Sequence, residues 1–194
     1  MEFTQQIDDY LAKLTRTLER LDRSEVNKFA ELLLAAYEGG RKVLVFGNGG
    51  SASTASHFAC DINKGVSYGM DKRFRIMPLT DNMATIMAYA NDVSYEEVFL
   101  EQLKNFLEPG DLVVGISGSG NSKNVLKAIE YAKQKGNITV GICGYMGGKL
   151  REISHHSVNA NFNDMQISED VHFILMHLMM KITSKSITGT EARC

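Results

Sequence analysis

Histidines and carboxylates recur at helical spacing in two separate segments of the sequence. His57 and Asp61 stand four residues apart, and Glu169 and His177 stand eight apart, a little over two helical turns. At such spacings both members of a pair can face one site. Two imidazoles and two carboxylates suit Zn²⁺ or a similar divalent ion and leave a coordination position for substrate oxygens. The spacing alone is weak evidence, because such pairs occur on many helices.

Two neighbouring residues have ordinary structural explanations. His172 lies within an apolar run, so we expect a core or interface histidine that is hydrogen-bonded to a neighbour. Cys60, which follows His57 by three residues, is expected to be a small core side chain.

Two loops rich in glycine and serine each follow a β-rich run and precede a helical segment. They are the GNGGS loop, residues 47–51, and the SGSGNS loop, residues 117–122. A turn from a strand into a helix directs free backbone N–H groups and the positive end of the helix dipole at one point, which suits a phosphate. The serine hydroxyls add hydrogen bonds, and the glycines let an anion approach the backbone. We expect phosphate ligands at Ser51, Ser117, Ser119 and Ser122.

Neither loop is a standard nucleotide motif. Both lack the lysine that ends a P-loop, and Ala52 stands where a dinucleotide fingerprint needs its third glycine. The structural alternative is that both are ordinary turns with capping serines.

The elements that must position these residues alternate along the chain. Strands are expected at 42–46, 75–79, 112–117, 138–143 and, more weakly, 156–161. Helices are expected from the first loop to about 64 and at 95–107, 123–136, 147–153 and 164–187. This alternation predicts a parallel sheet with helices on both faces.

A helical pair precedes this α/β segment. An apolar stripe between residues 3 and 21 predicts the first helix, and Ser24 is a candidate N-cap for a second that Gly39 and Gly40 end. Such a pair covers either its own domain or a second subunit. We expect one domain over 1–194, with an oligomerisation segment at 1–40 and an α/β core at 41–194.

Composition excludes several classes of protein. Apolar residues make up 44% and charged residues 23%, which is typical of a globular chain rather than a disordered one. A net charge of −2 gives no electrostatic reason to expect nucleic acid or anionic membranes as partners. No apolar run is long enough for a membrane span, and the first residues do not resemble a signal peptide. Three scattered cysteines favour a reducing cytoplasm.

With these motifs in place, the sequence resembles the sugar isomerase (SIS) domain family over essentially its whole length. Within this family it is most similar to phosphoheptose isomerases, which convert sedoheptulose 7-phosphate to heptose 7-phosphate. The matching segments are Phe46–Ser51, Asn91-Asp92, Gly115–Ser122, Gly144 with Gly147-Gly148, and the histidine-bearing last helix.

The resemblance implies a fold and an assembly. We expect a three-layer α/β/α sandwich with a five-stranded parallel sheet, a homotetramer, and active sites shared between subunits. It also implies zinc, a phosphosugar substrate, a cytoplasmic location, and a place in lipopolysaccharide or capsule heptose biosynthesis.

The resemblance also exposes two departures. Asp61 stands where the family has glutamate, and Glu169 stands where it has glutamine, unless a shifted helix makes Gln166 the equivalent. A carboxylate one methylene shorter moves a proton-transfer atom by more than about 1 Å, which matters to catalysis. Glu169 adds a negative charge that favours metal binding.

The resulting assignment is a set of hypotheses about roles. Asp61 and His177 are expected to share acid–base work, and His57, Asp61, Glu169 and His177 to surround the metal. The substrate-binding set is Asn48, Gly49, Gly50, Ser51, Asn91, Asp92, Ser117, Gly118, Ser119, Ser122, Gln166 and Glu169. Two alternatives stay open: an isomerase of another phosphosugar, and a non-catalytic SIS module that binds phosphosugars or a partner protein.

Overall fold

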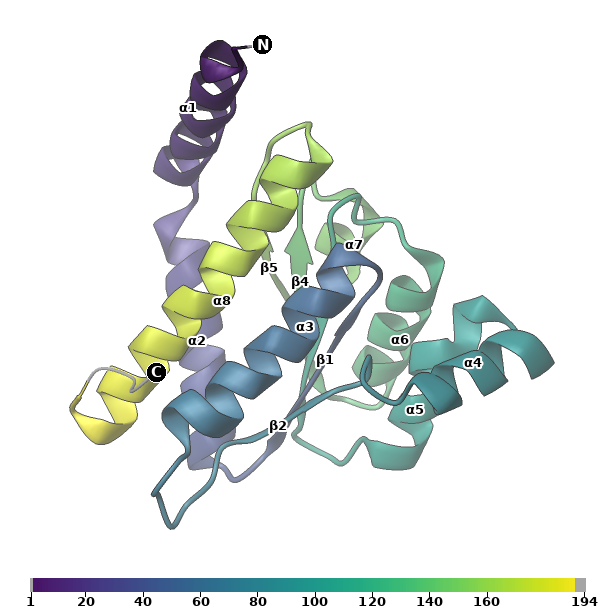
Figure 1. The fold of residues 1–194 in the computed structure, drawn as a ribbon. Coiled ribbons are helices and arrows are strands. Elements are labelled where there is room, and N and C mark those ends of the chain that lie inside the picture. Colours follow the sequence, from purple (N-terminus) through teal and green to yellow (C-terminus); the bar gives the residue numbers. More distant parts are fainter. Residues whose placement is uncertain (1, 191–194) are drawn as a thin grey trace.

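The computed structural model describes residues 2–190, and its centre is a five-stranded, all-parallel sheet (Figure 1). The strand order is β2-β1-β3-β4-β5. The strands are β1 (Lys42–Gly47), β2 (Arg75–Pro78), β3 (Leu112–Ser117), β4 (Ile138–Cys143) and β5 (His156–Asn159). The expected strands and the parallel sheet are confirmed.

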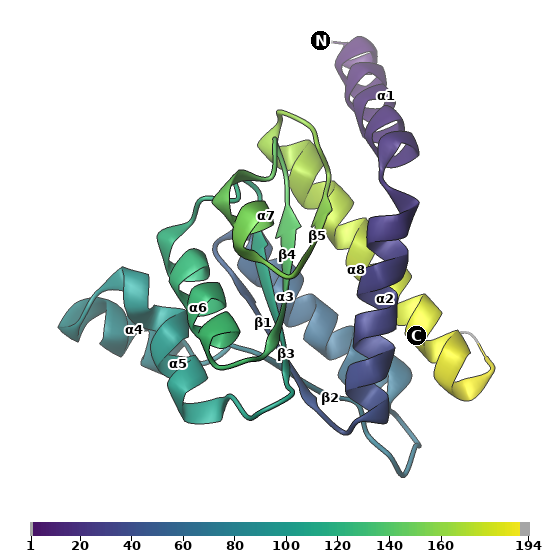
Figure 2. The same ribbon diagram turned by 180° about the vertical axis from the view of Figure 1, so that it is seen from behind.

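Helices cover both faces of this sheet, so the expected three-layer sandwich is confirmed (Figures 1 and 2). One layer contains α2 (Arg23–Glu38), α3 (Gly50–Cys60) and α8 (Met165–Thr188). The other contains α5 (Val98–Phe106), α6 (Lys123–Gln134) and α7 (Gly148–Ile153).

The core follows from strands that are apolar on both sides. In β1, Val43 and Val45 pack with α2, α3 and α8, whereas Leu44 and Phe46 pack with α5 and α6. All four side chains are fully buried. Because successive side chains of a strand point to opposite faces, a continuous apolar run fills both cores and holds the loops at the strand ends.

The N-terminal pair is present, but its two helices differ in their packing. Helix α2 lies on the sheet, and its N-cap is Asp22, not Ser24, because the Asp22 carboxylate accepts hydrogen bonds from the Ser24 and Glu25 backbone N–H groups. Helix α1 (Thr4–Arg20) extends beyond the rest of the molecule (Figure 2). Its apolar residues Phe3, Ile7 and Leu11 are 54–56% exposed.

Three helical elements, α4, η1 and η2, differ from the expected pattern. Helix α4 (Met83–Asp92) contains no fully buried residue, and only Ile86, Tyr89 and Ala90 pack partly against the core. A π-helix, η1 (Asp61–Val66), continues α3, and a short 3₁₀ turn, η2 (Tyr95–Glu97), precedes α5. Within residues 2–190, no helix is both long and apolar enough to cross a membrane.

Candidate active site

Helices α3 and α8 run side by side and bring the two sequence-predicted clusters together. Near their N-terminal ends, the Glu169 carboxylate lies directly against Gly50. Two turns further along both helices, His57 faces His177, with 2.9 Å between their Nε2 atoms. Both glycine loops lie at the carboxyl ends of the parallel strands, where α/β sheets commonly bind ligands.

His57, Asp61 and His177 form a group that we call the metal group. Asp61 Oδ2 lies 3.4 Å from His57 Nε2 and 3.7 Å from His177 Nε2. Among the described residues it is a group whose ligand atoms all lie within 4.8 Å of one another. The Oδ2 atom is buried and accepts no hydrogen bond from the chain.

This arrangement fits a divalent ion. Ligand atoms at about 2.0–2.1 Å from a tetrahedral zinc are about 3.3–3.4 Å apart, and the three observed separations bracket that value. A buried carboxylate oxygen without a hydrogen bond is costly unless a cation offsets its charge. Three protein ligands leave a fourth position open to substrate, as catalytic zinc sites do.

Phe173 is a member of the site that the sequence analysis did not identify. Its ring stacks on His57 at 4.7 Å between centroids and meets His177 edge-on at the same distance. The ring therefore restricts both imidazoles. Phe173 precedes His177 by four residues, so helical spacing was an available signal.

Glu169, expected as a fourth metal ligand, is not part of the metal group. It lines a cavity of about 180 Å³ with both glycine loops, which we call the serine cavity. The residues that line it are Asn48, Ser51, Ile116, Ser117, Gly118, Ser119, Ser122, Met165 and Glu169.

The SGSGNS loop gathers its serine hydroxyls at the carboxyl end of β3. The Ser117 and Ser122 hydroxyls lie 3.1 Å apart, and the Ser119 Oγ accepts a hydrogen bond from the Asn121 N–H at 3.2 Å. Gly120 has a φ of +66° and lies so close to the Gly147 carbonyl that any side chain would collide with it. The turn at 144–148 therefore braces the loop from behind.

Asn48 of the GNGGS loop is fixed by partners distant in sequence. Its carboxamide exchanges two hydrogen bonds, each 2.9 Å, with the buried carboxamide of Asn124 at the start of α6. The Tyr95 hydroxyl donates a third bond of 2.8 Å to Asn48 Oδ1. These contacts tie the GNGGS loop to the start of α6 and to η2.

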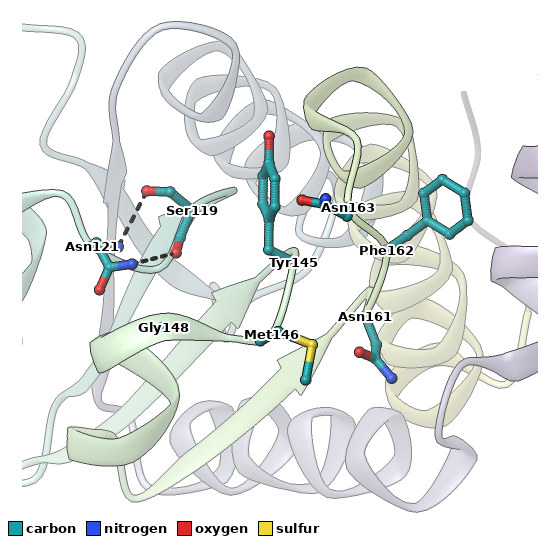
Figure 3. A pocket seen from close by; sticks show the side chains of 8 residues that line it. All are labelled: Ser119, Asn121, Tyr145, Met146, Gly148, Asn161, Phe162 and Asn163. Carbon is teal, nitrogen blue, oxygen red and sulfur yellow. Dashed lines mark hydrogen bonds between the residues drawn. The ribbon is translucent and has the colours of Figure 1, made fainter.

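A larger cavity of about 570 Å³ lies beside the serine cavity and shares Ser119 with it (Figure 3). None of its lining residues is charged; they are Ser119, Asn121, Tyr145, Met146, Gly148, Asn161, Phe162 and Asn163. The Tyr145 ring stands between Ser119 and Asn163 in Figure 3.

Five of the expected substrate ligands line neither cavity: Gly49 and Gly50 lie in the GNGGS loop between Asn48 and Ser51, which line the serine cavity, and three others lie elsewhere. Asn91 and Asp92 are exposed at the end of α4, where the Asn91 amide donates to Asp92. Gln166 is exposed in the first turn of α8. None of these three lines either cavity.

His172 and Cys60 have contrasting outcomes. His172 is 1% exposed and its Nε2 lies 2.7 Å from the Cys143 carbonyl oxygen, so the structural interpretation is confirmed. Burial lowers the pKa of His172 to about 4, against a smaller opposing effect of that hydrogen bond.

The expectation for Cys60 is wrong: its side chain is exposed, because α3 turns Phe58 and Ala59 toward the core instead. Cys60 and Cys143 are free thiols, and Cys194 lies outside the described residues.

Comparison with known proteins identifies relatives along nearly the full chain. The family model described as "SIS domain" matches residues 9–144. The phosphoheptose isomerase of Geobacter sulfurreducens is 35% identical over 188 residues, which cover 93% of this chain and 98% of that protein. The phosphoheptose isomerase of Helicobacter pylori is 35% identical over 182 residues, covering 89% and 93%.

A solved structure gives the same result. The phosphoheptose isomerase of Neisseria gonorrhoeae superposes with a TM-score of 0.87 and 26% identity, covering 95% of this chain and 100% of that one. Sequence and structure agree over both the helical pair and the sheet. The chain therefore belongs to the SIS domain family and, within it, to the phosphoheptose isomerases.

Proposed function

We propose that this chain is a phosphoheptose isomerase that interconverts sedoheptulose 7-phosphate and D-glycero-D-manno-heptose 7-phosphate. Its relatives carry that name at about one third identity over most of their length. The single observation that carries the substrate assignment is the distance between the two halves of the site.

That distance matches a long-chain sugar phosphate. Glu169 lines the serine cavity and His177 belongs to the metal group, so α8 rises by about 12 Å between them at about 1.5 Å per residue. An extended seven-carbon chain with a terminal phosphate spans about 10 Å, given carbon–carbon bonds of about 1.5 Å. With the phosphate in the serine cavity, C1 and C2 reach the metal group, which a three-carbon phosphosugar is about 5 Å too short to do.

The residues at that end can move the protons that the reaction requires. A proton passes from C1 to C2 while the C1 hydroxyl proton passes to the C2 oxygen, through an enediol. Asp61 and His177 share these transfers. A carboxylate has two oxygens, so Asp61 can keep Oδ2 toward the imidazoles and use the other as a base.

His57, Asp61 and His177 are the residues that would hold Zn²⁺. When bound, the ion supplies Lewis acidity that polarises the carbonyl and stabilises negative charge on the sugar oxygens. Phe173 keeps the two imidazoles in the orientation that the ion needs.

At the other end, hydroxyls and backbone groups bind the phosphate. Ser51, Ser117, Ser119 and Ser122 surround the serine cavity together with the first turn of α3. Asn48, held by Asn124 and Tyr95, presents its remaining amide hydrogen to sugar hydroxyls.

The segment 1–40 is proposed to serve assembly into a homotetramer, with residues 41–194 as the catalytic core. The exposed apolar stripe of α1 supports this division, because single exposed apolar residues are ordinary but an aligned row is not. In such an assembly Asn91 and Asp92, exposed in one chain, would serve a neighbouring subunit's site.

Direct conversion assays test the proposal. Purified protein is incubated with sedoheptulose 7-phosphate and, separately, with five- and six-carbon ketose phosphates, and the isomers are separated chromatographically. We expect the seven-carbon substrate to be converted most efficiently and His177→Ala to lower kcat by about 100-fold or more. Gln134→Ala, at an exposed position of α6, is the control. Equal turnover by His177→Ala, or binding of phosphosugars without conversion, would contradict the proposal.

A further inference from the structure

We propose that Tyr95 is a positioning residue of the site: its hydroxyl makes the Asn48 carboxamide a hydrogen-bond donor only, directed at a sugar oxygen beside the phosphate. The inference rests on the proposed function, in which Asn48 binds the sugar, and deepens it. It assigns control over phosphosugar binding to a residue that lines neither cavity.

The orientation of the Asn48 carboxamide follows from its neighbours. The Val125 backbone N–H donates to Asn124 Oδ1 at 2.9 Å. A backbone N–H can only donate, so this contact fixes which end of the Asn124 carboxamide is the oxygen. Asn124 and Asn48 exchange two hydrogen bonds of 2.9 Å each, so the fixed carboxamide of Asn124 fixes that of Asn48 in turn.

The Tyr95 hydroxyl occupies the last acceptor position of this pair. An amide oxygen has two lone pairs, and an amide nitrogen has two hydrogens. On Asn48, Oδ1 accepts from Asn124 Nδ2 and, at 2.8 Å, from the Tyr95 hydroxyl, so both lone pairs are used. The Asn48 Nδ2 atom gives one hydrogen to Asn124 and keeps the other. Because Asn48 lines the serine cavity, that hydrogen is all that its carboxamide can offer to a ligand there.

The Tyr95 hydroxyl is held in place by η2 and not by burial of its ring, which is 55% exposed. Ion pairs join η2 to α6: Lys127 Nζ lies 3.0 Å from a Glu96 carboxylate oxygen and 2.6 Å from one of Glu97. Asn124 belongs to the same helix, so Tyr95 and Asn124 reach the GNGGS loop from one braced unit. Because the ring is exposed, the hydroxyl can be removed without changing the packing of the core.

A carboxamide that can only donate favours a ligand with an acceptor at the same place. A sugar phosphate offers a hydroxyl oxygen on the carbon next to its phosphate ester, whereas inorganic phosphate has no such group. The Tyr95 hydroxyl therefore contributes to binding of the sugar and not of the anion. Without this hydroxyl, the Asn48 carboxamide loses one of three restraints and is less well preorganised for the sugar oxygen.

Tyr95→Phe tests this inference, because it removes the hydroxyl and keeps the ring. The probes are inorganic phosphate and the alditol made by reducing sedoheptulose 7-phosphate, which keeps the phosphate and the hydroxyls but has no carbonyl to isomerise. Calorimetric titrations give both affinities. We expect the variant to bind the alditol phosphate about three- to tenfold more weakly, the effect of one hydrogen bond, and to bind inorganic phosphate within about twofold of the wild type.

A double-mutant cycle tests whether Tyr95 acts through Asn48. Asn48→Ala removes the carboxamide, so adding Tyr95→Phe to it should cause no further loss of affinity for the alditol phosphate. Tyr131→Phe is the control for the loss of a tyrosine hydroxyl, because Tyr131 lies further along α6 and lines neither of the two cavities. It should leave both affinities unchanged.

Three results would overturn the inference. They are an unchanged affinity for the alditol phosphate in Tyr95→Phe, an equal loss of affinity for both ligands, and a full loss when Tyr95→Phe is added to Asn48→Ala. None of these measurements needs turnover. A protein without isomerase activity that shows the predicted affinities and coupling would therefore support the role of Tyr95 and contradict only the proposed reaction.

Discussion

Asp61 is the residue on which the candidate metal group depends, because it supplies the only carboxylate. It lies where the regular turns of α3 change into the π-helix η1, a local widening that is often found at functional sites. The Asp61 side chain is one methylene shorter than the glutamate expected from the family. Its Oδ2 nevertheless faces both imidazoles, so the aspartate is long enough to reach them.

The first prediction concerns metal content. Elemental analysis of gently purified protein should find about one divalent ion per chain, the number that one three-ligand site holds. Asp61→Asn and His57→Ala should each lose it, because an amide is a poor ligand and alanine is none. Glu130→Gln, at an exposed position of α6, is the matched control and should retain the ion. Full metal content in Asp61→Asn would contradict the site.

Ser119 gives the second prediction. Its Oγ accepts a hydrogen bond from Asn121, so the hydroxyl proton remains free to donate to an anion. Replacing Ser119 by alanine should cost about 1.5–3 kcal/mol, or roughly ten- to hundred-fold in phosphosugar affinity measured by calorimetry. Ser186→Ala, exposed near the end of α8, should change nothing. An affinity within twofold of wild type in Ser119→Ala would mean that the loop is only a turn.

At the residue scale, the sequence predicts the candidate metal ligands better than it predicts the residues that hold the site in place through hydrogen bonds. Helical spacing brought out His57, Asp61 and His177 because the repeat of an α-helix is fixed. It could not place Asn124 or Tyr95, whose contacts with Asn48 cross 76 and 47 residues of chain. Such pairs arise only when the sheet fixes the distance between loops.

At the element scale, the strands and core helices follow from their patterns, whereas elements without a buried face do not. Helix α4 buries no residue fully and packs only Ile86, Tyr89 and Ala90 partly against the core, so its periodic signal is weaker than that of α5 and α6. The π-helix is missed for another reason: its sequence is compatible with an ordinary helix, and its contact with α8, where Gly65 meets Met180, is made by residues far apart in the chain.

Helix α1 carries the element-scale prediction. Leu14 and Leu18 pack partly on the core, but Phe3, Ile7 and Leu11 extend the same stripe into solvent. If this stripe joins subunits, Ile7→Asp with Leu11→Asp should shift the particle to smaller species in light scattering, because burying a charge without a partner is costly.

The control places the same two charges on the polar face of α1, as Gln5→Asp with Ala12→Asp, both at exposed positions. That variant should keep the wild-type size. If the variant with Ile7→Asp and Leu11→Asp keeps the wild-type particle size, α1 has no role in assembly. That result would favour the alternative that α1 only covers its own domain.

At the scale of the whole molecule, His172 links the stability of the fold to pH. The residue lies on α8 between Glu169 and His177, and its Nε2 meets the carbonyl at the end of β4, so it joins the helix that carries the site to the sheet. Its Nδ1 is buried and has no hydrogen-bond partner. Protonation would therefore place a charge in the core without compensation.

The sign of the effect follows from the lowered pKa. Burial lowers the folded-state pKa of His172 from 6.5 to about 4, so the unfolded chain binds this proton first as pH falls. The free energy of unfolding should decrease between pH 6.5 and 4, by up to about 3 kcal/mol from this residue alone at about 1.4 kcal/mol per pH unit.

Urea titrations of wild type and His172→Phe across that pH range measure this decrease. The difference in unfolding free energy between the two proteins should shrink or reverse as pH falls. His155→Gln is the control, because His155 is exposed and its pKa is lowered only by modest burial and by Lys133. A parallel pH dependence in wild type and His172→Phe would show that His172 is charged in the folded protein, and that the contact between α8 and β4 tolerates that charge.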